Sequence, residues 1–77
     1  MENKIQIKAT WDPEVRVWVA ESDDVPGLIT EADTMEQLVN KLHILIPELL
    51  QENGVDTRAR EISFDLLSER KETVLCG

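Results

Sequence analysis

Hydrophobic and polar residues alternate along three segments of the chain, which is the pattern of half-buried β-strands. The segments span residues 4–11, 15–20 and 61–67. A fourth, shorter apolar stretch at 28–32 predicts another strand, and its brevity together with the charge of Glu31 suits the edge of a sheet. The pattern therefore predicts four strands, three of them before residue 33.

Turn residues separate the first three predicted strands. Asp12-Pro13-Glu14 has Asp and Pro at the first two positions of a turn, so the first two strands are expected to form an antiparallel hairpin. Val25-Pro26-Gly27 closes the next loop. Pro-Gly favours a type II turn there, because glycine adopts a positive φ without steric cost.

A helical period replaces the alternation after Thr34. Apolar residues recur three and four positions apart over 35–50, which makes a stripe wide enough to cover a sheet. Thr34 and Gln37 have the spacing of a capping box, and Gly54 suits the left-handed position after the helix. Pro47 interrupts the pattern, because it lacks an N–H group and clashes with the preceding turn. We expect a kinked helix or two helical segments.

This order of elements predicts an α+β fold. Three antiparallel strands followed by a helix and a right-handed crossover place the fourth strand parallel to the first. The strand order is then 3-2-1-4, with the helix on one face of the sheet and an apolar strip on the uncovered face. Residues 1–77 form a single domain. The tail at 68–77 either frays or adds a short strand to its own or a neighbouring sheet.

Size and charge narrow the functional classes. A domain of 77 residues is only marginally stable alone, and its single cysteine forms no internal disulfide, so we expect a homodimer or higher homo-oligomer. The net charge of −8 disfavours a nucleic-acid-binding surface and favours a basic partner. Neither a membrane span nor a secretory signal segment is recognisable, and we expect a cytoplasmic protein.

The sequence offers no catalytic, cofactor-binding or metal-binding constellation. A metal-dependent nuclease is the alternative, since carboxylates bind hard cations, but such sites need carboxylates that converge from several elements. A solvated acidic rim is favoured instead, as is a surface position for His43 and Cys76. The acidic residues concerned lie mostly in predicted loops: Asp12, Glu14, Glu21, Asp23, Asp24, Glu31 and Asp33.

Five residues are candidates for a partner interface. Trp18 shares a strand face with Arg16, and these two residue types are favoured at interface hot spots. Burial of Trp18 in the core is the equal alternative, because strand facing read from sequence can slip by one residue. The acids Asp23, Asp24 and Glu31 would steer the association of a basic partner.

Several short motifs, taken in order, resemble the small stand-alone members of the HicB-like antitoxin superfamily. The likeness covers roughly residues 5–68. The motifs are Asp12-Pro13-Glu14, Trp18-Val19-Ala20, Val25-Pro26-Gly27-Leu28, the run from Thr30 to Thr34 and the segment Ile46-Pro47-Glu48-Leu49-Leu50.

The resemblance implies a degenerate ribonuclease-H-like fold that lacks the catalytic carboxylates. HicB antitoxins bind HicA, a small basic toxin that cleaves mRNA, and mask its active site. By resemblance, the chain is a non-enzymatic module that sequesters a toxin of this kind. The other possibility is an orphan homo-oligomeric adaptor that has lost the toxin.

Overall fold

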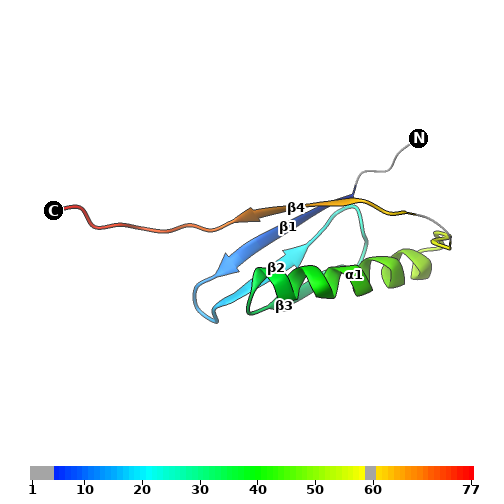
Figure 1. Cartoon of the computed structure of the whole chain (residues 1–77), viewed down its shortest axis with the longest axis horizontal. Coiled ribbons are helices and arrows are strands. Elements are labelled where there is room, and N and C mark those ends of the chain that lie inside the picture. The colour runs from blue at the N-terminus through cyan, green and yellow to red at the C-terminus, as the bar shows by residue number, and fades with distance from the viewer. Residues whose placement is uncertain (1–4, 59–60) are drawn as a thin grey trace.

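The computed structural model describes residues 5–58 and 61–77 of the chain (Figure 1). Its elements are β1 (Ile5–Asp12), β2 (Val17–Glu21), β3 (Ile29–Ala32), α1 (Met35–Glu52) and β4 (Phe64–Glu69). The strands form one mixed sheet in the order β3-β2-β1-β4, and α1 lies on one face of it. The predicted α+β fold and strand order are therefore confirmed.

The first strand occupies an inner position of the sheet. β1 pairs antiparallel with β2, where Ala9 lies opposite Ala20, and parallel with β4, where Ile7 lies opposite Leu66. Period two places alternate residues of β1 against the helix, and Ile5, Ile7 and Ala9 are buried. The crossover through α1 thus brings the last strand beside the first.

The core lies between α1 and the sheet. Leu38, Leu42, Ile46 and Leu50 recur every four residues along α1, and all four side chains are buried. The sheet and the loop before β3 contribute the remaining buried apolar residues, which are Ile5, Ile7, Ala9, Ala20, Val25, Leu28 and Ala32. Every fully buried side chain in the described part of the chain is apolar.

α1 begins and ends where the sequence predicts. Thr34 is the N-cap, and its Oγ1 accepts a hydrogen bond from the Gln37 amide at 3.1 Å. Gly54 follows the helix with a φ of 85°, the left-handed conformation expected there. The helix is continuous through Pro47, so the alternative of two helical segments is wrong. Burial of Ile46 and Leu50 on either side of this proline offsets the missing backbone bond.

The hairpin turn is longer than predicted. β2 starts at Val17 instead of Val15, and Val15 and Arg16 belong to the turn. The Asp12 carboxylate accepts a bond from the Glu14 amide at 3.0 Å, and the Asp12 carbonyl accepts one from the Arg16 amide at 2.8 Å. Closing this loop requires a positive φ at its last residue, and Arg16 has a φ of 60°.

The other strand boundaries differ by small shifts. The strand predicted at 4–11 is β1, and residue 4 lies outside the described residues. The strand predicted at 28–32 begins one residue later, as β3. The strand predicted at 61–67 is β4, which is displaced towards the C-terminus. Its apolar face is the predicted one, because Ile62, Phe64 and Leu66 pack against the core.

The loop between β2 and β3 contains the predicted type II turn. Gly27 has a φ of 87°, and the Leu28 amide donates to the Val25 carbonyl at 3.1 Å. Asn53 joins this loop to the end of α1, since its side-chain amide donates to the Pro26 carbonyl at 3.3 Å and to the Leu49 carbonyl at 2.8 Å.

Replacement of Thr34 tests the helix cap. Thr34→Ala removes the side-chain acceptor for the Gln37 amide and should lower the free energy of unfolding by about 1 kcal/mol. Thr34→Ser keeps the hydroxyl and should remain close to wild type. Urea denaturation followed by circular dichroism measures both variants. Equal stability of Thr34→Ala and Thr34→Ser would contradict the assigned role of the cap.

Candidate functional site

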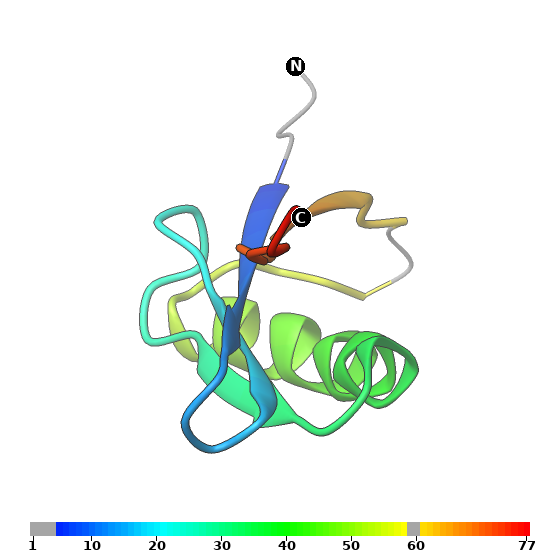
Figure 2. The same ribbon diagram turned by 90° about the vertical axis from the view of Figure 1, so that its left-hand side faces the viewer.

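The face of the sheet opposite α1 is covered by no helix of the described residues (Figure 2). The strand registers place alternate residues of all four strands on this face, and we call them the open face. Its members are Gln6, Lys8, Thr10, Asp12, Val17, Val19, Glu21, Ile29, Glu31, Asp65, Leu67 and Glu69.

The open face combines apolar and acidic side chains. Val17 and Val19 are half-buried, whereas Ile29 is 70% exposed and Leu67 is 56% exposed. Five members of the open face are acids, namely Asp12, Glu21, Glu31, Asp65 and Glu69, and Lys8 is its single base. Val17, Val19 and Ile29 lie together on β2 and β3, whereas Leu67 lies on β4, separated from Ile29 by Glu21 and Lys8. The open face is therefore negatively charged and carries two separate apolar areas, a combination that suits contact with a basic macromolecule.

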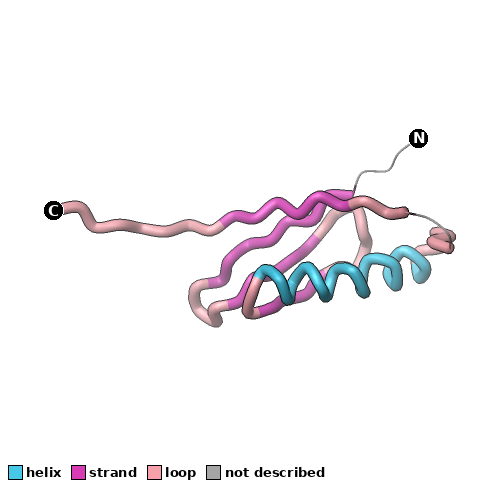
Figure 3. The backbone as a smooth tube through the Cα atoms, in the orientation of Figure 1, coloured by secondary structure: helices cyan, strands magenta, loops and turns pink. Residues whose placement is uncertain are grey.

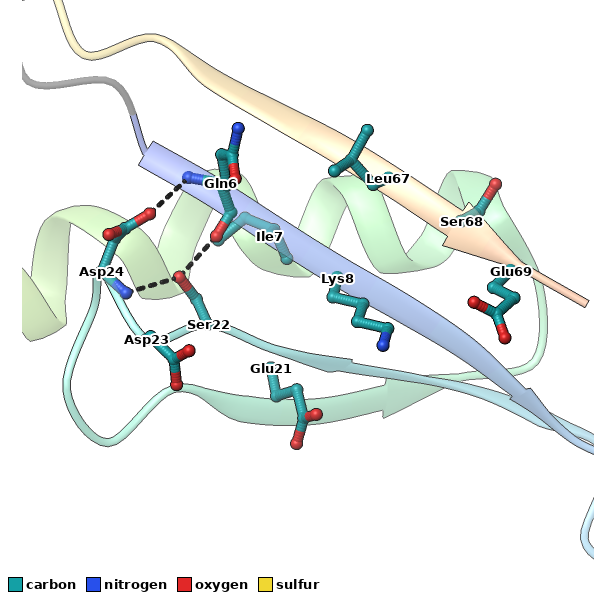
Figure 4. Close-up of a pocket in the computed structure, with 10 residues that line it drawn as sticks. All are labelled: Gln6, Ile7, Lys8, Glu21, Ser22, Asp23, Asp24, Leu67, Ser68 and Glu69. Carbon is teal, nitrogen blue, oxygen red and sulfur yellow. Dashed lines mark hydrogen bonds between the residues drawn. The ribbon is translucent and has the colours of Figure 1, made fainter.

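One end of the open face is held by a set of hydrogen bonds that we call the Ser22–Asp24 clasp (Figure 4). The Ser22 hydroxyl donates to the Gln6 carbonyl at 2.6 Å and accepts from the Asp24 amide at 3.0 Å. The Asp24 carboxylate accepts from the Gln6 amide at 2.9 Å. The backbone pairing of β1 with β2 ends at Lys8 and Glu21. From there towards the start of β1, the side chains of Ser22 and Asp24 take the place of backbone hydrogen bonds between the two segments. The clasp thereby fixes the loop after β2 against the start of β1.

A solvent-open hollow of about 510 Å³ lies beside the clasp. Lys8 and Glu21 come from the two inner strands, Leu67 and Glu69 come from β4, and Asp23 stands at the rim (Figure 4). Both charged and apolar side chains line it. The hollow can therefore receive a protruding side chain of a partner, and a basic side chain would find Glu21, Asp23 and Glu69 there.

The five predicted interface residues do not form one patch. Glu31 lies opposite Val19 and belongs to the open face, whereas Trp18 lies opposite Ala32 and belongs to the helix side. Asp23 is exposed at the rim of the hollow. Arg16 occupies the turn at the other end of β2, and the Asp24 carboxylate is engaged in the clasp.

Trp18 packs against the hydrophobic core, which favours the core interpretation of this residue. Its ring meets the ring of Trp11 edge to face, with the centroids 5.3 Å apart. The Arg70 guanidinium lies over Trp11, with 4.2 Å between its central carbon and the ring centroid. The two tryptophans therefore join the hairpin to the end of β4.

The described residues include no group of three or more His, Cys, Asp or Glu side chains placed to hold a metal ion. His43 is exposed, and its ring lies edge to face against Phe64 at 5.7 Å. Cys76 is exposed in the tail. These positions bring no nucleophile, base and cation together, and the open face is the best-defined candidate site.

The sequence pattern does not predict the clasp. Ser and Asp often bond to backbone groups in turns, so the run Glu21-Ser22-Asp23-Asp24 carried a signal for loop-fixing side chains. It did not indicate which carboxylate bonds to Gln6. The path of the loop determines that Asp24 bonds to Gln6, whereas Asp23 lines the hollow.

Paired substitutions test the clasp. Asp24→Ala removes the acceptor for the Gln6 amide and should lower the free energy of unfolding by about 1 kcal/mol, whereas Asp24→Asn keeps an acceptor and should lose less. Asp23→Ala is the matched control and should stay within about 0.5 kcal/mol of wild type. Urea denaturation measures all three. Equal losses for Asp23→Ala and Asp24→Ala would rule out a specific role for Asp24.

A solved structure resembles this chain over almost its whole length. It is the crystal structure of hypothetical protein TTHA1013 from the extremely thermophilic bacterium Thermus thermophilus, which is 49% identical with a TM-score of 0.70. The alignment covers 96% of this chain and all of that one. No curated protein matches the chain. No helix in the described residues is long and apolar enough to cross a membrane.

A family match is also found, and it covers residues 4–76. That family is described only as a domain of unknown function, so the match assigns neither an activity nor a partner. The HicB-like resemblance continues to rest on the sequence motifs quoted above. By the extent of the match, the chain belongs to the DUF1902 family.

Proposed function

We propose that this domain is a non-enzymatic interaction module that binds a small basic protein through the open face. The observation that carries the proposal is the composition of this face. Ile29 and Leu67 are exposed on a sheet surface that α1 leaves uncovered. They lie at opposite edges of this surface with Glu21 and Lys8 between them, and acids from all four strands share the face.

The charge of the molecule supports a basic partner. The net charge is −8, and the open face carries one base against five acids. Such a field accelerates the encounter with a protein of opposite charge and disfavours partners of like charge. The apolar residues on β2 and β3, and Leu67 on β4, then supply area that is removed from water in the complex.

The resemblance to HicB-like antitoxins narrows the partner class. In that superfamily the partner is a small basic protein that cleaves mRNA, and the antitoxin masks its active site. We propose the same role here. The domain would occupy the RNA-binding surface of the partner with its own carboxylates, which replace the phosphates of RNA.

Charge reversal on the open face tests this function. The open-face variant is tagged Glu21→Lys/Glu31→Lys. The α1 variant, Glu48→Lys/Glu52→Lys, has the same change in charge at exposed positions of α1. In affinity capture from an extract of the native cells, the wild type and the α1 variant should retain a small basic protein that high salt releases. The open-face variant should lose it. Purified partner should cleave RNA, and added wild-type domain should stop the cleavage.

Two results would overturn the proposal. One is retention of the same protein by the open-face variant, which would place the contact elsewhere. The other is a captured protein whose RNA cleavage is absent or unaffected by the domain. Recovery of the domain alone would favour the orphan homo-oligomeric adaptor, for which the protruding tail provides a structural basis.

A further inference from the structure

The C-terminal tail, residues 70–77, continues the line of β4 beyond the sheet (Figures 1 and 3). None of the strands in the described residues pairs with it. Val74 is 78% exposed and Leu75 is 97% exposed. The tail also accounts for much of the elongated shape, which measures 56 Å along one axis and 24 and 18 Å along the others.

β4 is an edge strand with apolar residues on both faces. It pairs with β1 on one side only. Phe64 and Leu66 are half-buried on the helix side, and Leu67 is 56% exposed on the open face. The backbone of α1 lies nearest to β3 and β2, and His43 of α1 reaches Phe64 without covering the outer edge of β4. The outer side of β4 pairs with no strand of the described residues, and the tail after Glu69 extends this edge, which can serve as a template for another strand.

We propose that two copies of this chain pair antiparallel along this edge, with the tail of each copy beside β4 of the other. The two sheets then form one continuous sheet about a two-fold axis. Backbone groups of the tail then hydrogen-bond to the outer edge of β4 in the other copy, and Val74 and Leu75 leave water. The contact is isologous, so it closes as a dimer and leaves neither copy with this edge free.

Alternation along β4 and the tail restricts the register. Residues opposite each other in an antiparallel pair lie on the same face of the sheet. A two-fold axis between two residues would break this rule, so the axis must pass through a residue. An axis at Arg70 places Leu66 opposite Val74 and Glu69 opposite Lys71. Both pairs are complementary, one apolar and one of opposite charge.

An axis one residue later satisfies the same rule. With Lys71 on the axis, Leu67 lies opposite Leu75 and Arg70 lies opposite Glu72. In each register the residue on the axis faces its own counterpart, and the base next to it faces an acid of the other copy. That acid is Glu69 of β4 in the first register and Glu72 of the tail in the second. This charge complementarity favours a second copy as the occupant of the edge.

Contacts within one molecule already align the tail. The Arg70 guanidinium stacks on Trp11 and forms an ion pair with Glu72 at 2.5 Å. These contacts hold the first residues of the tail in line with β4. Less conformational entropy is then lost when a second copy pairs with it.

The oligomeric mass of the purified chain is the first test. Sedimentation or light scattering should give twice the chain mass of 8.8 kDa for the wild type. Val74→Asp/Leu75→Asp should give the single-chain mass with an unchanged circular dichroism spectrum. Ile44→Asp is the control, because Ile44 is 63% exposed on α1, and it should remain a dimer. A wild type that stays monomeric up to millimolar concentration would overturn the proposal.

Single cysteines test the position of the axis. In a Cys76→Ser background, Arg70→Cys or Lys71→Cys places two cysteines opposite each other across the two-fold axis, where a disulfide can form. Mild oxidation should give a covalent dimer for one of them. Glu31→Cys, on the opposite edge strand β3, should give none. The native Cys76 should give none either, because the two Cys76 residues of the dimer would lie more than about 30 Å from each other.

Cross-linking at position 31 in place of positions 70 and 71 would assign the contact to β3 and overturn the proposal. Efficient cross-linking through the native Cys76 would do the same, because it would bring the two tails together end to end. These experiments use the purified chain alone. Their outcome is therefore independent of whether the open face binds a basic partner.

Discussion

The width of a four-stranded sheet compared with a single helix is the constraint on which this structure depends. Neighbouring strands lie about 4.8 Å apart, so four strands span roughly 14 Å between the outer two, and a helix with its side chains is about 10–12 Å across. α1 therefore cannot cover the whole sheet. It lies over β2 and β3 and supplies large side chains, while Ala9, Ala20 and Ala32 leave room for them. The outer backbone edge of β4 and the whole open face remain uncovered by α1, although Phe64 still contacts His43.

Much of the fold could be predicted from the sequence because its signals are local. Period two identified the strands, period 3.6 identified α1, and Thr34 and Gly54 marked its ends. The strand order followed from the handedness of the crossover. Two details differ where tertiary contacts decide the outcome. β2 starts later than predicted because Arg16 adopts a positive φ to close the hairpin, and α1 is one helix and not two segments because burial on both sides of Pro47 offsets the missing backbone bond.

The candidate site was harder to predict because it depends on register between strands. Trp18 and Glu31 lie on different strands, and only their partners, Ala32 and Val19, show that they face opposite sides of the sheet. The clasp depends on the path of a loop, which no periodicity describes. An uncovered face that bears apolar residues of the second strand was predicted from the sequence. Its exposed members Ile29 and Leu67 emerged from the observed registers.

The parallel pairing of β1 with β4 has a consequence for synthesis on the ribosome. β1 is made first and takes an inner place in the sheet, while its parallel neighbour is made last. The hairpin, β3 and α1 can assemble earlier, but β1 then keeps an unpaired edge until the final strand has emerged. Closing a contact between Ile5 and Phe64 also costs more chain entropy than closing the hairpin. The nascent domain thus carries an aggregation-prone edge until β4 emerges, and the domain can complete its sheet only after β4 has left the ribosome.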